Sequence, residues 1–217
     1  MRTPADIHLP LQDRSRATLE KILDATEDLL RDRVLDDISI AEIMERADMA
    51  VGTFYRRFKT KEALLPYLYA RYDHELGTQE SDWLAPENWT GLNLEERAVR
   101  VAELAVRTYR ERRGLWRAVL VRSVAHPESV SDDQRRRRRR LVRRLADLLA
   151  ECADEIQHPD PALAAEMGIV VVMAVCKDKI LTESRGQAYS RRLSDRRLAL
   201  ELARVLLGYL GREPRGR

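Results

Sequence analysis

The sequence has few cysteines, glycines, prolines and aromatic residues, and each shortage argues against a class of protein. Its two cysteines, Cys152 and Cys176, lack a CxxC spacing and lie in apolar surroundings, so we expect buried thiols rather than a disulfide, a metal site or a redox switch. Nine glycines and eight prolines in 217 residues leave long stretches without a turn signal, and no run alternates apolar and polar residues as a strand would. The sequence therefore predicts an all-α fold of about nine helices.

Signals for membranes and for catalysis are also missing. No apolar run approaches the length of a membrane-spanning helix, and no basic N-terminal stretch leads into an apolar core with a cleavage site, so we expect a cytoplasmic protein. The four histidines are scattered, and the sequence has no HExxH, GxSxG or Gly-rich phosphate loop. We therefore expect no enzyme activity, no metal and no cofactor.

Charged side chains make up 35% of the chain, and the formal net charge is +3. Residues 1–75 hold more carboxylates than basic side chains, so net charge alone does not reveal a surface for phosphates. Clustering is the relevant property. Basic residues gather in two places that together would form such a surface, namely Arg14, Arg16 and Lys21, and then Arg56, Arg57, Lys59 and Lys61.

The segment 38–65 predicts two short helices joined by a sharp turn, with a third helix after them. The first helix, over 40–47, has its apolar residues on one face. Ser39 and Glu42 have the spacing of a capping box, which gives this helix a defined start. Asp48 suits the turn, because aspartate tolerates the left-handed backbone conformation better than most residues.

The second short helix, over 50–57, would bury Phe54 and Phe58 and expose the chemistry of a recognition helix. Glycine lets the backbone come close to another surface, and threonine offers a hydroxyl and a methyl group to a base edge. Tyrosine and arginine can bond phosphate oxygens. The alternative is that the aromatic residues only form a core cluster. We accept this for Phe54 and Phe58. We do not accept it for Tyr55, because its neighbours three and four positions away are polar or small. The exposed face consists of Val51, Gly52, Thr53, Tyr55 and Arg56.

These residues closely resemble the DNA-binding domain of the TetR family of bacterial transcription regulators. The resemblance covers about Thr18 to Leu65, with order, spacing and residue type in agreement across three helices. Val34, Asp48 and Ala50 depart from it, where the family usually has glycine, glycine and a capping serine. The matching positions are Ile22, Leu23, Ala25, Leu29, Leu30, Ile40, Ile43, Ala47, Gly52, Thr53, Phe54, Tyr55, Phe58, Lys61 and Leu64.

The resemblance also implies which residues meet DNA. Val51 and Thr53 would face bases. The contacts to the phosphate backbone would come from Thr18, Ser39, Tyr55 and Lys61. The full set of DNA-binding candidates is Thr18, Ser39, Ala50, Val51, Gly52, Thr53, Tyr55, Arg56 and Lys61.

Three parts are expected along the chain: a flexible N-terminal arm (1–13), the helix-turn-helix DNA-binding domain (14–60), and a larger helical domain for regulation and dimerisation (61–217). Periodicity, caps and breakers place the remaining helices at 14–33, 61–78, 94–113, 115–125 and 132–157, followed by two more that begin near 161 and 195. Gly114 is expected to end the helix over 94–113. Residues 81–93, which contain two tryptophans, are expected to form a loop.

In the family's architecture the last two helices pack against their copies in a second subunit as a four-helix bundle. The alternative is an ordinary monomeric core, but the symmetric half-sites of a DNA operator favour a homodimer. The candidate interface residues are Met167, Val170, Val171, Ala174, Leu198, Leu202, Val205, Leu206 and Tyr209.

Members of this family commonly hold a small effector in a cavity of the larger domain. Each candidate for the lining is, taken singly, more typical of core or surface than of a ligand contact. As a group they suggest an aromatic-lined pocket with a few polar groups. The candidates are Tyr72, Trp89, Tyr109, Trp116, Arg122, His126 and Met173.

Six consecutive arginines, Arg135–Arg140, are the oddest local feature. They would wrap all faces of a helix and oppose its dipole near the N-terminal end. We favour a solvated, partly salt-bridged helix. A second nucleic-acid contact and an anionic effector are the alternatives that remain open.

The sequence thus predicts a sequence-specific DNA-binding transcription regulator, a homodimer on a pseudo-palindromic operator in double-stranded DNA. By the resemblance it would be a repressor that a small-molecule effector releases from the operator. Two alternatives compete with this prediction: an architectural DNA-binding protein without an effector, and a helical interaction protein that has lost DNA binding.

Overall fold

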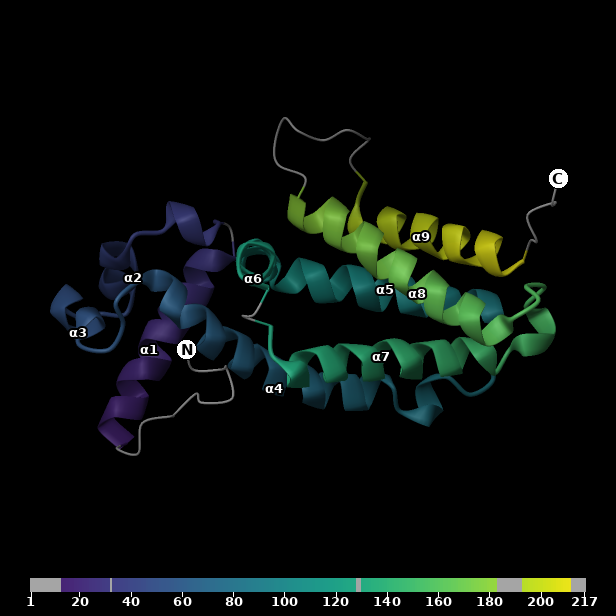
Figure 1. Ribbon diagram of the computed structural model, residues 1–217, viewed down its shortest axis with the longest axis horizontal. Coiled ribbons are helices and arrows are strands. Elements are labelled where there is room, and N and C mark those ends of the chain that lie inside the picture. Colours follow the sequence, from purple (N-terminus) through teal and green to yellow (C-terminus); the bar gives the residue numbers. More distant parts are fainter. Residues whose placement is uncertain (1–12, 32, 128–129, 183–192, 212–217) are drawn as a thin grey trace. The chain divides into compact units, whose positions relative to one another are not determined.

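The computed structural model describes residues 13–31, 33–127, 130–182 and 193–211. These residues form helices joined by short turns and no strand, so the predicted all-α fold is confirmed (Figure 1). The nine α-helices of these ranges are α1 (Asp13–Leu30), α2 (Ile40–Arg46), α3 (Val51–Tyr55), α4 (Leu65–Trp83), α5 (Leu94–Glu111), α6 (Arg113–Ala125), α7 (Asp132–Ala150), α8 (Pro161–Lys177) and α9 (Asp195–Leu210).

The helices belong to two compact units. Unit 1 comprises residues 1–78 and 112–132, and unit 2 comprises residues 79–111 and 133–217. Unit 1 therefore includes α6 as well as α1 to α3 and most of α4. The boundary predicted at residue 60 separates a DNA-binding domain from a regulatory domain, whereas the two units are defined by packing. The functional boundary therefore stays a prediction.

Local sequence signals set the start of α2 and the turn after it. Ser39 Oγ accepts a hydrogen bond from the Glu42 amide at 3.1 Å, and Glu42 Oε2 accepts one from the Ser39 amide at 2.8 Å. Asp48 has a φ of 55°, which lies in the left-handed region. The predicted capping box and the predicted left-handed turn are both confirmed.

The core of unit 1 is built from the apolar faces of its helices. Ile22 of α1, Ile43 of α2 and Phe54 of α3 have no exposed surface. The rings of Phe54 and Phe58 pack with their centroids 5.4 Å apart. Each fully buried side chain of this size stabilises the fold by about 1.5–3 kcal/mol. This core holds α3 with one face inward, as predicted for the two phenylalanines.

The prediction for Gly114 was wrong. The helix α5 ends at Glu111, and Gly114 lies in the first turn of α6, where it is buried. A Cβ atom at Gly114 would lie 2.0 Å from the backbone oxygen of Leu30 and 2.9 Å from that of Arg33. The glycine is needed because the backbone of α6 meets the backbone at the end of α1. This requirement comes from tertiary packing, and a glycine in the local sequence does not distinguish it from the end of a helix.

Three other boundaries also differ from the expected ones, among them the end of α7, which lies at Ala150 rather than at residue 157. The helix α1 ends at Leu30 rather than at residue 33, and α4 continues to Trp83, past the expected start of a loop at 81. Trp89 is buried, and its indole Nε1 donates to the backbone oxygen of Trp83 at 2.9 Å. This contact satisfies a carbonyl at the end of α4 and explains the longer helix.

Unit 2 is a helical bundle in which α5, α8 and α9 pack against one another (Figure 1). Its helix starts agree with the predicted caps. Asn93 Oδ1 accepts from the Glu96 amide at 2.9 Å, and Asp160 and Ser194 cap α8 and α9 through the amides three residues on.

The guanidinium of Arg97 is buried within unit 2. It donates to the backbone oxygens of Trp89 and Leu92 at 3.0 Å, to that of Leu148, and to Glu151 Oε2 at 2.7 Å. A buried charge requires such a set of acceptors, because burial without them would be strongly unfavourable. Arg97 thus joins the segment before α5 to the end of α7.

Both cysteines are free thiols. Cys176 is buried, as predicted, whereas Cys152 is only half-buried. Burial raises the pKa of the Cys176 thiol to about 12. Among the helices of the described ranges, none is long and apolar enough to cross a membrane.

Candidate nucleic-acid interface

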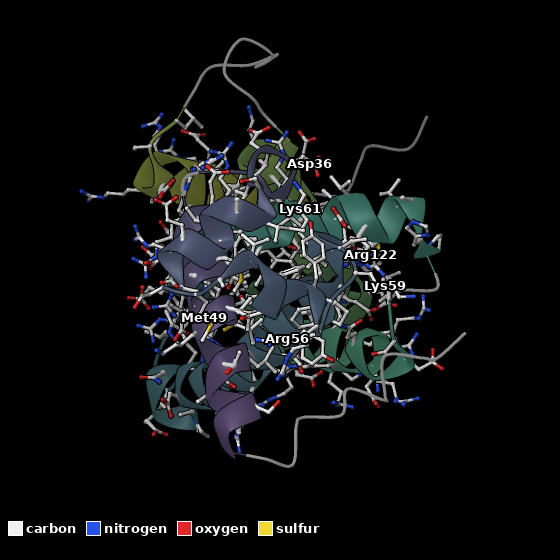
Figure 2. The ribbon with its side chains drawn as sticks, turned by 90° about the vertical axis from the view of Figure 1, so that its left-hand side faces the viewer. Asp36, Met49, Arg56, Lys59, Lys61 and Arg122 are labelled. Carbon is white, nitrogen blue, oxygen red and sulfur yellow. The ribbon has the colours of Figure 1, made fainter. Side chains whose placement is uncertain are left out.

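The outward face of α3 is the part of unit 1 best suited to contact another molecule (Figure 2). Val51 and Tyr55 are 41% and 58% exposed, whereas Phe54 between them is fully buried. Gly52 is exposed, and a Cβ atom built on it would meet nothing within 4 Å. The glycine is therefore not required for packing inside this chain. Its outward backbone is free for a close approach by a partner.

The polar side chains of α3 are held in a defined arrangement. Arg56 Nη2 donates to Thr53 Oγ1 at 2.9 Å, which aligns the guanidinium along the exposed side of the helix. Thr53 is half-buried and Arg56 is exposed. A guanidinium has five N–H donors, so Arg56 can also donate to a phosphate or a base edge while it keeps this bond.

Arg57 connects α3 to the start of α1. Its Nη2 donates to the backbone oxygen of Ser15 at 2.8 Å and also to the Ser15 hydroxyl. We predicted Arg57 only as one charge in a basic cluster, because no local sequence signal reveals a contact with a residue 42 positions away. The bond fixes the first turn of α1 beside the candidate recognition helix.

Lys61 makes a similar connection, from the segment after α3 to the loop before α2. Its Nζ donates to the backbone oxygens of Leu35, Asp36 and Ile38 at 2.7, 2.9 and 2.8 Å. An ammonium has three N–H donors, so these bonds engage all of them. Lys61 therefore fixes the loop between α1 and α2, a role that the sequence did not reveal. Its contact with DNA phosphate stays a prediction.

The other DNA-binding candidates lie at helix starts or on α1. Ser39 and Ala50 are exposed at the N-caps of α2 and α3, and Ala50 has no side-chain cap bond, as its replacement of serine implies. Thr18 is half-buried on α1. Figure 2 views this side of unit 1, with Arg56, Lys59 and Lys61 labelled on it.

The many carboxylates of α1 are paired within unit 1. Arg71 of α4 contacts Asp24 at 2.6 Å and Glu27 at 2.9 Å, and Arg112 contacts Glu27 at 2.8 Å and Glu75 at 2.7 Å. Glu27 is only 11% exposed. Asp24, Glu27 and Arg71 line part of an open pocket of about 410 Å³. These ion pairs neutralise acidic residues of the N-terminal region within unit 1, and none of these carboxylates belongs to α3.

Two further carboxylates are held ionised by arginines. The hydrogen bond from Arg33, at 2.6 Å, and the bonds to Ser39 lower the pKa of Glu42 to about 2. The hydrogen bond from Arg46, at 2.8 Å, lowers the pKa of Asp28. Both pairs tie α2 to the segments that precede it.

The candidates for an effector pocket are divided between the two units. In unit 1, the rings of Tyr72 and Trp116 are in edge contact, with centroids 5.4 Å apart. Burial raises the pKa of Glu62, but hydrogen bonds from Thr60 and the backbone, with the charges of Lys61 and Arg122, outweigh it and lower that pKa. His126 is exposed after the end of α6. In unit 2, Trp89 and Tyr109 are buried and Met173 is half-buried. The aromatic contact thus brings two of these candidates together within unit 1.

The candidates for a dimer interface also divide into two groups. On α8, Met167, Val170, Val171 and Ala174 are all exposed, as an intersubunit surface requires. On α9, Val205 and Tyr209 are exposed. The other three differ from expectation, because α9 turns them toward α5 and α8 inside unit 2 and buries them. These three are Leu198, Leu202 and Leu206.

Comparisons with known proteins find similarity to one family in the N-terminal segment. Residues 22–68 match the family model described as bacterial regulatory proteins, tetR family. The chain is 32% identical over 100 residues to YwcC, an uncharacterized HTH-type transcriptional regulator of Bacillus subtilis, with 45% of each protein covered. It is 45% identical over 47 residues to YvdT, another such regulator of the same organism, with 22% of this chain and 24% of YvdT covered. The chain thus spans less than half the length of either curated relative.

Solved structures show a similar fold over nearly the whole chain. A tetR-family regulatory protein from Rhodococcus RHA1 has a TM-score of 0.56 and 19% identity, with 91% of this chain and 98% of that chain covered. NalD, the secondary repressor of the MexAB-OprM multidrug efflux pump in Pseudomonas aeruginosa, has a TM-score of 0.52 and 18% identity, with 93% and 100% covered. Identities this low support the fold alone. The family and these relatives are regulatory proteins rather than enzymes, in agreement with the motif analysis.

Proposed function

This chain carries the DNA-binding domain of the tetR family of bacterial regulatory proteins, and from that premise we propose that it regulates transcription by binding an operator in double-stranded DNA. The observation that supports this most directly is the outward face of α3. It combines an exposed Val51 and Tyr55, an unobstructed Gly52 and an Arg56 aligned by Thr53. Base edges are read by such apolar and hydrogen-bonding groups, while phosphates fix the position of the helix.

The proposed regulator is a homodimer. The exposed apolar residues on α8 recur at helical spacing and continue onto α9 through Val205 and Tyr209. A contiguous apolar surface of this kind is typical of an interface between subunits. Two copies would place two recognition helices in successive major grooves, about 34–36 Å apart, on a pseudo-palindromic site.

The proposed regulator represses transcription until a small-molecule effector releases it. The arrangement of unit 1 supports such a release, because Arg71 of α4 and Arg112 at the start of α6 both bind Glu27 of α1. A shift of α4 or α6 would therefore move the helix that supports α3. By linkage, the operator must lower the affinity for the effector by the same factor as the effector lowers that for the operator.

The first experiment is selection of bound fragments from the source genome at physiological salt, followed by titration of the best site. A tight inverted repeat supports the regulator. Weak binding that is sensitive to salt and indifferent to sequence would support the architectural alternative.

Variants of α3 then test the site. Tyr55→Ala and Arg56→Gln should weaken operator binding with an unchanged helix content and oligomeric state, each by about tenfold, which corresponds to about 1.4 kcal/mol. The matched control is Arg31→Gln, because that side chain is 75% exposed and follows the end of α1. Equal affinity for all three proteins would support the interaction protein that has lost DNA binding.

Dimerisation and release need their own measurements. Val170→Glu should convert the protein to monomers in sedimentation equilibrium, whereas Val124→Glu, on an exposed residue of α6, should not.

For release, the operator complex is titrated with a low-molecular-weight extract of the source cells grown under several conditions. Operator affinity that no extract changes would contradict an effector.

A further inference from the structure

The arginine run of the sequence lies on α7 in unit 2, and the proposed function makes no use of it. Two of its members have acidic partners there. Arg136 pairs with Asp133 at 2.6 Å, and Arg137 pairs with Glu80 at 3.4 Å. Four exposed arginines of the same helix differ, since they form no ion pair or hydrogen bond with any residue in the described ranges. We call them the arginine face: Arg139, Arg140, Arg143 and Arg144.

The arginine face repels itself. Arg139 and Arg143 are four residues apart, as are Arg140 and Arg144, so each pair forms neighbours on one side of α7. Like charges at this spacing destabilise a helix. Elsewhere on the chain, arginines such as Arg71, Arg110 and Arg112 lie beside carboxylates. Asp147, one turn after Arg143 and Arg144, offsets only part of this repulsion, and a bound anion would reduce the rest.

The surroundings of the arginine face restrict the kind of anion. The apolar residues Val142, Leu145, Ala146 and Leu149 of α7 are buried within unit 2, and Leu141 and Leu148 are half-buried, so the helix has no fully exposed apolar side chain to enter a lipid bilayer. The helix also has no aromatic residue on which the bases of a single strand could stack. What it offers is a set of planar guanidinium groups, which match phosphate oxygens in two-bond geometry.

We propose that the arginine face binds the phosphate backbone of a DNA duplex, without regard to sequence and separately from α3. From Arg139 to Arg144 the helix rises about 7.5 Å. A DNA duplex carries about four negative charges over that length, which equals the four guanidinium charges of the face. The contact goes beyond the proposed operator site, because it gives the chain a second and independent hold on duplex DNA.

The test is the salt dependence of binding to a short labelled duplex that contains no inverted repeat. The full chain is compared with two double variants, Arg139→Gln/Arg143→Gln and Arg140→Gln/Arg144→Gln, by fluorescence anisotropy. Glutamine keeps the helix propensity and removes the repulsion, so α7 should remain folded. Each double variant should flatten the slope of log affinity against log salt by about 1.8, because each phosphate that is no longer neutralised reduces the slope by about 0.9.

The matched control is Arg196→Gln/Arg197→Gln, which removes the same charge from exposed residues at the start of α9. Its slope should equal that of the unmodified chain. Two results would overturn the proposal: an unmodified slope in both arginine-face variants, or an equal flattening in the control, which would mean that only the total charge matters. Labelled polyglutamate provides another arm. If it binds in an arginine-dependent way while the duplex slope stays the same, the face binds an acidic protein instead.

The two DNA contacts can fail separately. Thr53→Ala is expected to abolish the preference for an operator over other duplexes and to leave the arginine-dependent part of the slope intact. If the unmodified chain showed no preference for any operator, the proposed function would be contradicted. The slopes of the unmodified chain and of the arginine-face variants should still differ in that case.

Discussion

Arg112 and Glu27 join the start of α6 to the last turn of α1 through an ion pair of 2.8 Å, and the same carboxylate oxygen of Glu27 also binds Arg71 of α4 at 2.9 Å. One nearly buried carboxylate therefore holds three helices of unit 1. Hydrogen bonds to charged groups contribute more to stability than neutral ones, and their loss is felt most where the group is shielded from water.

Glu27→Gln should lower the free energy of unfolding by about 2 kcal/mol, because it removes a charge-assisted bond from each of two arginines. Urea denaturation followed by circular dichroism measures this. The control is Asp24→Asn, whose side chain is 64% exposed although it also pairs with Arg71. Asp24→Asn should lower the free energy of unfolding by less than about 1 kcal/mol. Equal effects of the two substitutions would contradict the central role of Glu27.

Gly114→Ala should destabilise unit 1 by about 2 kcal/mol, since the new methyl group would collide with the Leu30 backbone oxygen and force α6 away from α1. Gly52→Ala is the control, because that position is open and helical. Its thermal midpoint should stay the same or rise slightly, as alanine favours the helix. If Gly114→Ala were as stable as the control, the close contact between α1 and α6 would be wrong.

Lys61→Met should destabilise the loop between α1 and α2, by about 2 kcal/mol, because it removes three donors from backbone oxygens. Lys59→Met, at an exposed position two residues earlier, should leave stability within about 0.5 kcal/mol of the original. Thermal denaturation of both variants separates the connecting role of Lys61 from a role as a surface charge. A salt titration of DNA binding on Lys61→Arg then asks whether its charge also reaches phosphate.

The capping box of α2 should make stability depend on pH. The pKa of Glu42 is about 2 in the folded chain against an ordinary value of 4.5. Since the folded pKa is the lower one, the contribution of Glu42 is complete above its ordinary pKa and is lost as the pH falls toward 2. Glu42→Gln should therefore have a lower Tm than the original at neutral pH, and the two values should converge in acid. Glu45→Gln, which is exposed on the same helix, should show no such difference.

The features that sequence reasoning identified are local ones. The caps at Ser39, Asn93 and Asp160 and the left-handed Asp48 each depend on residues within one helical turn, so short-range rules sufficed. The apolar face of α3 followed from helical periodicity for the same reason.

The features that it missed depend on distant segments. Gly114 carries the same local signal whether it ends one helix or lets another pass close by, and only the position of Leu30 decides between them. The three acceptors of Lys61 lie more than 20 residues away. On α9, periodicity identified an apolar stripe but could not show that α5 and α8 cover part of it.

Arg97 also determines how unit 2 can open. Its guanidinium binds carbonyls that precede α5 and another that belongs to the end of α7, so neither segment can separate without leaving a charge buried among apolar groups. Opening of only one of these two segments is therefore unfavourable. In hydrogen exchange, the amides of α5 and of the last turns of α7 should become exposed together, as one cooperative unit with a single opening free energy.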